Sequence, residues 1–176
     1  MREGLGVRLR GLVLSLGFLL AACSLTVTVP LPDETIGFQA LPDTQGKILY
    51  PKDPVSFSPP PVSPRNVVLE GTLEASQSLN TSLTFYVRLG DPKDASDCRD
   101  LEIIPAYACS IGPEDEGSGE ASFNNSPSAP LTLRGGNLTQ GIAQGRFWLG
   151  LKAEGLPSSA VTLTLKDAKA RVTVGF

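Results

Sequence analysis

The side chains with most potential for chemistry in this 176-residue sequence are three cysteines and a row of aspartates. The sequence contains no histidine. The most common general base, the Ser/His and Cys/His nucleophile pairs and the commonest zinc ligand are therefore missing. The sequence also has no phosphate-binding loop, dinucleotide fingerprint or Cys-x-x-Cys pair. It favours a non-catalytic protein and indicates no cofactor.

Cys23 stands at the end of an apolar stretch near the N-terminus. Arg2, Arg8 and Arg10 come first, and a mostly apolar run then leads to Leu20-Ala21-Ala22. This order of basic region, short apolar core and small residues is typical of a secretory signal. The core is about half as long as the ~20 apolar residues that a membrane-spanning helix needs, which argues against a retained transmembrane anchor.

Leu20-Ala21-Ala22-Cys23 resembles the lipobox of bacterial lipoproteins. The resemblance implies cleavage between Ala22 and Cys23, a diacylglyceryl group on the Cys23 thiol and often a fatty acyl chain such as palmitate on the freed amine. Two or three such chains hold a protein firmly, since each buried methylene contributes about 0.8 kcal/mol. In Gram-negative lipoproteins an Asp after the modified Cys favours the inner membrane. Ser24 stands here, so the resemblance implies the cell envelope, and the outer membrane rather than the inner one.

The two remaining cysteines, Cys98 and Cys109, form an even pair in a chain that carries an export signal. This predicts a disulfide, with two free buried thiols as the alternative. The bridge would close a short loop over residues 99–108, which the chain-entropy model values at roughly 3 kcal/mol.

Four aspartates recur at every third position: Asp91, Asp94, Asp97 and Asp100. Calcium prefers several oxygen ligands from a flexible loop, so these residues are weak candidates for a calcium site. The alternating ligand spacing of known calcium loops is missing, however, and aspartate is common at solvated turns and helix caps. The sequence therefore predicts no metal site.

The charge of the chain bears on its partners. The leader carries a net charge of +2, so its removal changes the formal charge from −3 to about −5. No basic run is present, which argues against nucleic acid as a partner. The partners expected are the membrane, through the N-terminal lipid, and an envelope protein or polymer.

An all-β fold is predicted because the chain has 18 glycines, 15 prolines and recurrent period-2 alternation. We expect an antiparallel β-sandwich, Ig-like, of about seven or eight strands. The residues expected to face inward are Val67, Leu69 and Leu73; Leu83, Phe85, Val87 and Leu89; Leu131 and Leu133; Phe147, Leu149 and Leu151; Val161, Leu163 and Leu165; and Val172, Val174 and Phe176.

The sequence divides into three parts: a signal peptide over 1–22, a Pro-rich segment over 23–66 and the sandwich domain over 67–176. The Pro-rich segment resembles a spacer, because proline removes the amide donor that a central strand needs. Alternating Leu25, Val27 and Val29 nevertheless predict an edge strand that packs on the domain. Within the domain, 110–130 is rich in Gly, Pro, Ser and Asn, which predicts a long exposed loop.

Tyr86, Arg88 and Trp148 fall on the strand face opposite the apolar sets. On an outward face these residues form a candidate binding patch. The alternative is that the N-terminal segment covers them, and its own apolar residues favour this alternative.

Two functions remain open from the sequence. The first is a lipid-anchored, non-catalytic envelope protein that acts as a binding or structural module at the cell surface or in the periplasm. The second is a carboxylate-based enzyme or carbohydrate-active accessory acting on envelope glycans. The second requires a groove with two close acids.

Overall fold

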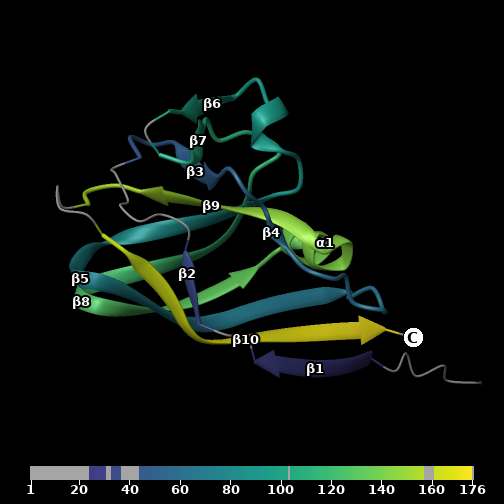
Figure 1. Cartoon of the computed structure of the whole chain (residues 1–176). Coiled ribbons are helices and arrows are strands. Elements are labelled where there is room, and N and C mark those ends of the chain that lie inside the picture. Colours follow the sequence, from purple (N-terminus) through teal and green to yellow (C-terminus); the bar gives the residue numbers. More distant parts are fainter. Residues whose placement is uncertain (1–23, 31–32, 37–43, 103, 157–160, 176) are drawn as a thin grey trace, which may run out of the picture.

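The computed structural model describes residues 24–30, 33–36, 44–102, 104–156 and 161–175. In these ranges the chain forms ten strands, one short 3-10 turn, η1 (Pro92–Asp94), and one α-helix, α1 (Gly136–Gln144) (Figure 1). The strands are β1 (Ser24–Pro30), β2 (Glu34–Ile36), β3 (Ile48–Pro51), β4 (Val55–Ser56), β5 (Asn66–Arg88), β6 (Cys98–Leu101), β7 (Ala106–Cys109), β8 (Glu116–Arg134), β9 (Arg146–Ala153) and β10 (Leu163–Gly175).

Two long strands, β5 and β8, organise the sheet. They pair antiparallel from Val68 opposite Arg134 to Val87 opposite Glu116. The register shifts between Glu74 and Asn80, and such irregularities bend a strand. Before the bend, the other edge of β5 pairs with β10, and after the bend it pairs with β9. One sheet therefore folds over to make two layers, with β5 and β8 running through both (Figure 1). The first layer contains β10, β1 and β2, and the second layer contains β9, β3, β7 and β6.

The strand order along the sheet is β1-β10-β5-β9-β3-β7-β6, with β2 on β10, β4 on β9 and β8 on β5. All the strand pairs are antiparallel. This confirms the predicted all-β sandwich. The strand boundaries differ from expectation, because the sets predicted as separate strands at 67–73 and 83–89 belong to the single bent strand β5.

The main core fills the space between the layers. Leu73, Leu131 and Leu163 come from one layer, and Phe85, Phe123 and Leu151 from the other, all 2% exposed or less. Leu138 of α1 is also fully buried in this core. No helix in the described ranges is both long and apolar enough to cross a bilayer.

Strands from the Pro-rich segment are hydrogen-bonded into the sheet. β1 is an end strand of the sheet path, on β10, and β3 lies between β9 and β7. Prolines border these strands rather than interrupt them, for example Pro51 at the end of β3. The described strands of the Pro-rich segment are therefore part of the sheet, and they do not form a free spacer between Ser24 and the domain.

The prediction of a long exposed loop over 110–130 is wrong for most of its length, because β8 begins at Glu116. β8 pairs only with β5 among the described strands, so its prolines need not donate to a second neighbour. Its glycines permit close packing. A Cβ at Gly119 would collide with the backbone of Thr132 in the same bent strand, which shows how closely the folded layers approach there.

We expect Gly150→Ala to destabilise the protein by about 1–3 kcal/mol through overpacking. A Cβ at Gly150 would lie 2.5 Å from Ile48 Cγ2 and press on the Tyr50 ring. Gly117→Ala is the matched control: Gly117 and Gly150 flank Tyr86 on opposite sides, but a Cβ at Gly117 would have its nearest contact at 3.8 Å. Urea denaturation measures both, and equal stability of the two variants would contradict this packing.

Candidate functional site

Tyr86, Arg88 and Trp148 lie on one face of the second layer, opposite the main core. The prediction that they form an exposed binding patch is wrong, because Trp148 is 1% exposed and Arg88 3%. Trp148 packs in a second apolar cluster with Ile48 and Tyr50 of β3 and with residues of β7, while Tyr86 packs partly buried against it. The N-terminal segment, through β3, therefore supplies part of the cover, as the alternative expected.

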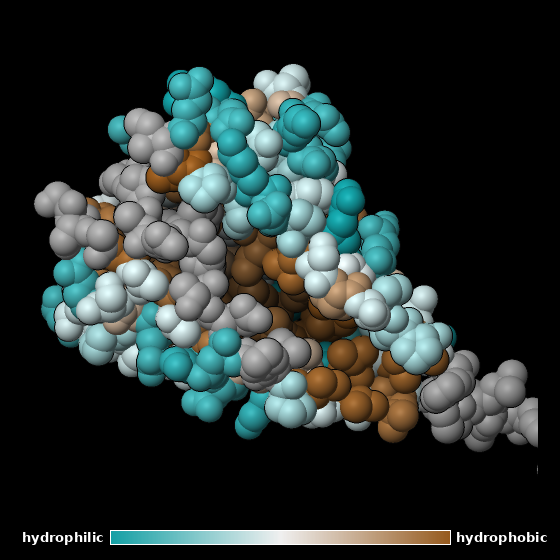
Figure 2. Space-filling view, in the orientation of Figure 1, coloured by the Kyte–Doolittle hydropathy of each residue, from teal (hydrophilic) through white to brown (hydrophobic). Residues whose placement is uncertain are grey.

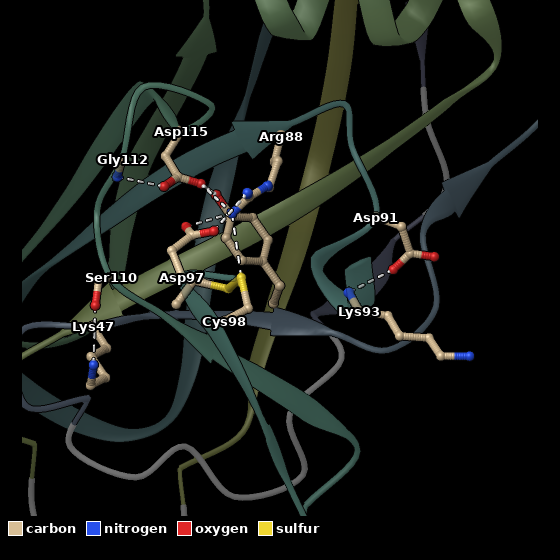
Figure 3. The surroundings of a disulfide bond; sticks show 11 residues. Lys47, Arg88, Asp91, Lys93, Asp97, Cys98, Ser110, Gly112 and Asp115 are labelled. Carbon is tan, nitrogen blue, oxygen red and sulfur yellow. Dashed lines mark hydrogen bonds and ion pairs between the residues drawn. A yellow bond between two sulfur atoms is a disulfide. The ribbon is translucent and has the colours of Figure 1, made fainter. Parts of the chain in front are cut away.

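The guanidinium of Arg88 is the centre of this covered face (Figure 3). It binds Asp97 through two parallel contacts, Nη1 to Oδ2 at 3.1 Å and Nη2 to Oδ1 at 3.2 Å. Nη1 also lies 3.4 Å from Asp115 Oδ1 and 3.4 Å from the Cys98 sulfur. A paired fork of this kind is among the stronger hydrogen-bonding arrangements in proteins. We call Arg88, Asp97, Asp115 and Tyr50 the Arg88 cluster.

Asp115 joins the cluster to the loop between β7 and β8. Its side chain is fully buried. Tyr50 donates its hydroxyl to Asp115 Oδ1 at 2.8 Å, and the Gly112 N–H donates to Oδ2 at 2.8 Å. The buried carboxylate therefore has donors on both oxygens, which offsets the cost of removing it from water.

The electrostatics of the cluster follow from this pairing. The hydrogen bonds from Arg88 hold the pKa of Asp97 below its usual value. Burial alone would lower the pKa of Arg88, but the hydrogen bonds to Asp97 and the charge of Asp115 outweigh it, so the net shift is upward. Burial, followed by the hydrogen bond to Asp115, raises the pKa of Tyr50. The charged forms of Arg88 and Asp97 are thus stabilised, and Tyr50 stays protonated.

The Cys98–Cys109 disulfide is present, as predicted, and lies against the cluster (Figure 3). Cys98 and Cys109 are directly opposite one another on β6 and β7. The Ser110 N–H donates to the Asp97 carbonyl at 2.9 Å, one step along the same ladder. The bridge therefore fixes the chain segment that presents the Asp97 carboxylate to Arg88.

Three of the four aspartates considered for calcium have other partners in the structure. Asp91 accepts the Lys93 N–H and caps η1, Asp97 binds Arg88, and Asp100 lies 2.8 Å from Lys52 Nζ. Asp91, Asp94, Asp97, Glu114 and Arg88 line a hollow of about 400 Å³. Within the described ranges, no set of three or more acidic, cysteine or histidine side chains is placed to hold a metal ion.

The hydrogen bonds of the Arg88 cluster suit a structural role better than a catalytic one. Asp97 and Asp115 are two close acids, but the same guanidinium binds both. A general acid needs a raised pKa and a free carboxyl, and Asp97 has a lowered pKa and a partner on each oxygen. The arrangement can hold the 89–97 and 110–115 segments over β5 and β3.

Sequence reasoning found Arg88 and Asp97 but not their companions Tyr50 and Asp115. Only the alternation around Tyr50, with Ile48 and Tyr50 on one face and Leu49 in the main core, indicates that this segment is a strand. No local signal joins position 50 to position 115. The predicted lipidation and cleavage residues, Ala22 and Cys23, lie outside the described residues.

We expect Asp97→Asn to lower the free energy of unfolding by about 1–3 kcal/mol at neutral pH, because a charge-assisted pair with a buried guanidinium is lost. The folded state lowers the pKa of Asp97, so its contribution is full above the ordinary value of 3.8 and is lost as the pH falls through the lowered one. Urea denaturation at a series of pH values should therefore show the difference from wild type shrinking below about pH 4.

Asp100→Asn is the control for this series, since its pair with Lys52 is exposed and contributes little to stability. A difference between wild type and Asp97→Asn that is the same at all pH values would contradict a stabilising charged Asp97.

Replacing both Cys98 and Cys109 by Ala should lower stability by roughly 3 kcal/mol, because the unfolded chain regains the freedom of the closed loop. Calorimetry of the variant, with reduced wild-type protein as the comparison, measures the loss. Unchanged stability in both would show that the Arg88 cluster holds β6 and β7 without the bridge.

Comparison of the chain with protein-family models, curated proteins and solved structures finds no match.

Proposed function

We propose that this protein is a lipid-anchored, non-catalytic module of the bacterial cell envelope, held at the outer membrane through Cys23. The observation that carries the proposal is Leu20-Ala21-Ala22-Cys23, placed directly ahead of a folded domain that starts at Ser24. Export, cleavage and acylation would leave the lipid on the first residue of the mature chain.

The disulfide supports an exported location. Disulfides persist in the periplasm and on the cell surface and are rare in the reducing cytosol. Cys98 and Cys109 are bridged in the structure, which leaves Cys23 as the remaining cysteine of the sequence. No other cysteine of the chain is therefore left to form a disulfide with Cys23, which agrees with its assignment to lipid.

The Arg88 cluster supports a non-catalytic role. Asp97 and Asp115, the two acids that bind Arg88, have their carboxylate oxygens hydrogen-bonded to Arg88, to Tyr50 and to a backbone amide. A sandwich of this kind, with its polar cluster used for internal support, suits a module that presents a surface to an envelope protein or polymer. Ser24, in the position where Asp would favour the inner membrane, supports the outer membrane.

We expect mass spectrometry of the protein, expressed with its leader in a Gram-negative host, to give an N-terminal peptide that begins at Cys23 and carries a diacylglyceryl group and an N-acyl chain. The Cys23→Ser variant should lack both lipids and leave the membrane fraction, since no other lipid attachment remains. An unmodified sulfur at position 23, or a leader that is retained uncleaved, would overturn the proposal.

A further inference from the structure

The edge of the first layer has one apolar face and one polar face. We call β1 together with residues 171–175 of β10 the edge ribbon. Leu25 lies opposite Val174, and Val27 lies opposite Val172, so these four side chains share one face of the ribbon with Val29. The other face is polar: Thr26 and Thr173 place their hydroxyl oxygens 3.1 Å apart.

The apolar face of the edge ribbon continues the main core outward, past the point where the second layer covers it. Val67 of β5, Val172 of β10 and Val27 of β1 lie in one row across the sheet. Val67 is 1% exposed, whereas Val27 is 44% exposed. Leu25 and Val29 are 52% and 43% exposed. Figure 2 shows apolar side chains gathered on the surface over β1 and the end of β10.

This face begins next to the residue that the proposed function acylates. β1 starts at Ser24, and a strand rises by roughly 3.3 Å per residue, so Leu25 and Val29 lie within about 7 and 20 Å of Cys23 along the chain. Acyl chains on Cys23 would place its sulfur at the boundary between headgroups and hydrocarbon. The edge ribbon would then have no spacer to keep it away from the bilayer.

A cation stands at the same end of the ribbon. The Arg65 N–H donates to the Thr173 carbonyl at 2.8 Å, and the Arg65 side chain packs against Gly175, the residue opposite Ser24. Arg65 and Arg134 line a hollow of about 620 Å³ whose described lining contains no acidic side chain. An exposed arginine at the end of an apolar face, here Arg65, suits the anionic headgroups of a bilayer.

We propose, on the basis of the proposed lipid anchor, that the apolar face of the edge ribbon is a membrane-contact surface. Leu25, Val27 and Val29 enter the interface between headgroups and acyl chains beside the lipid on Cys23, while Thr26 and Thr28 face water. The lipid and the ribbon together set the orientation of the sandwich on the membrane, with β1 against the bilayer.

The test uses the full lipidated protein in vesicles of phosphatidylethanolamine and phosphatidylglycerol with brominated acyl chains, which quench nearby indoles. Two variants, V27W and T28W, place a tryptophan on opposite faces of the same strand. Trp148, the single native tryptophan, is 1% exposed and serves as the internal reference. Vesicle flotation and mass spectrometry establish in each sample that the protein is lipidated and bound.

The added fluorescence of V27W should fall by on the order of half, because an interfacial face reaches about 5–10 Å into the headgroup and acyl boundary, and T28W should change little. Equal quenching of the two variants in vesicle-bound, lipidated protein would overturn the contact surface while leaving the anchor in place. Absence of quenching together with crosslinked dimers through β1 would instead assign the face to a second copy of the chain. Protein that carries no lipid and does not float would overturn the anchor, and the contact surface with it.

Discussion

The fold depends on the long antiparallel pairing of β5 with β8. Each strand passes through both layers, so the ladder between them joins the two halves of the sandwich. The bend between Glu74 and Asn80 lets the first half of β5 bind β10 and the second half bind β9. A local register irregularity therefore decides that one sheet becomes two packed layers, and the main core lies in the fold between them.

The Arg88 cluster completes the second layer in a different way. β6 and β7 supply little of the main core, so their attachment relies on the disulfide, on the second apolar cluster and on ion pairs between loops. Burying a charge is costly unless its partners are in place. Asp97 and Asp115 are those partners for Arg88, and Tyr50 donates in turn to Asp115. The buried Arg88 cluster thus lies beside strands that add little to the main core.

The all-β class and the inward sets could be predicted because alternation is a local property of a strand. Alternation places Leu83, Phe85 and Leu151 on the inward face, and all three lie in the main core. The exposure of Trp148 could not be predicted in the same way. Local alternation predicts which face of a strand a side chain lies on, but it does not predict which segment covers that face. Its cover comes from β3, about 100 positions earlier.

Two other features depended on distant residues. The 110–130 composition is that of a loop, yet pairing with β5 overrides it. The other edge of β8 pairs with no described strand, which accommodates its prolines. Gly135-Gly136-Asn137 has the composition of a turn. It opens α1 instead, because the Glu116 carboxylate accepts the N–H groups of Gly136 and Asn137. The Cys98–Cys109 pair could be predicted because a predicted export signal and the count of cysteines suffice for it.

The position of β1 has a mechanical consequence. Its seven residues pair with β10 in an unbroken register from Ser24 opposite Gly175 to Pro30 opposite Lys169. The ladder bonds of an antiparallel pair are perpendicular to the strands. A force applied through the proposed lipid anchor along the axis of β1 would therefore load these bonds in shear, all at once. A force applied across the axis of β1 would break the hydrogen bonds of this ladder one after another.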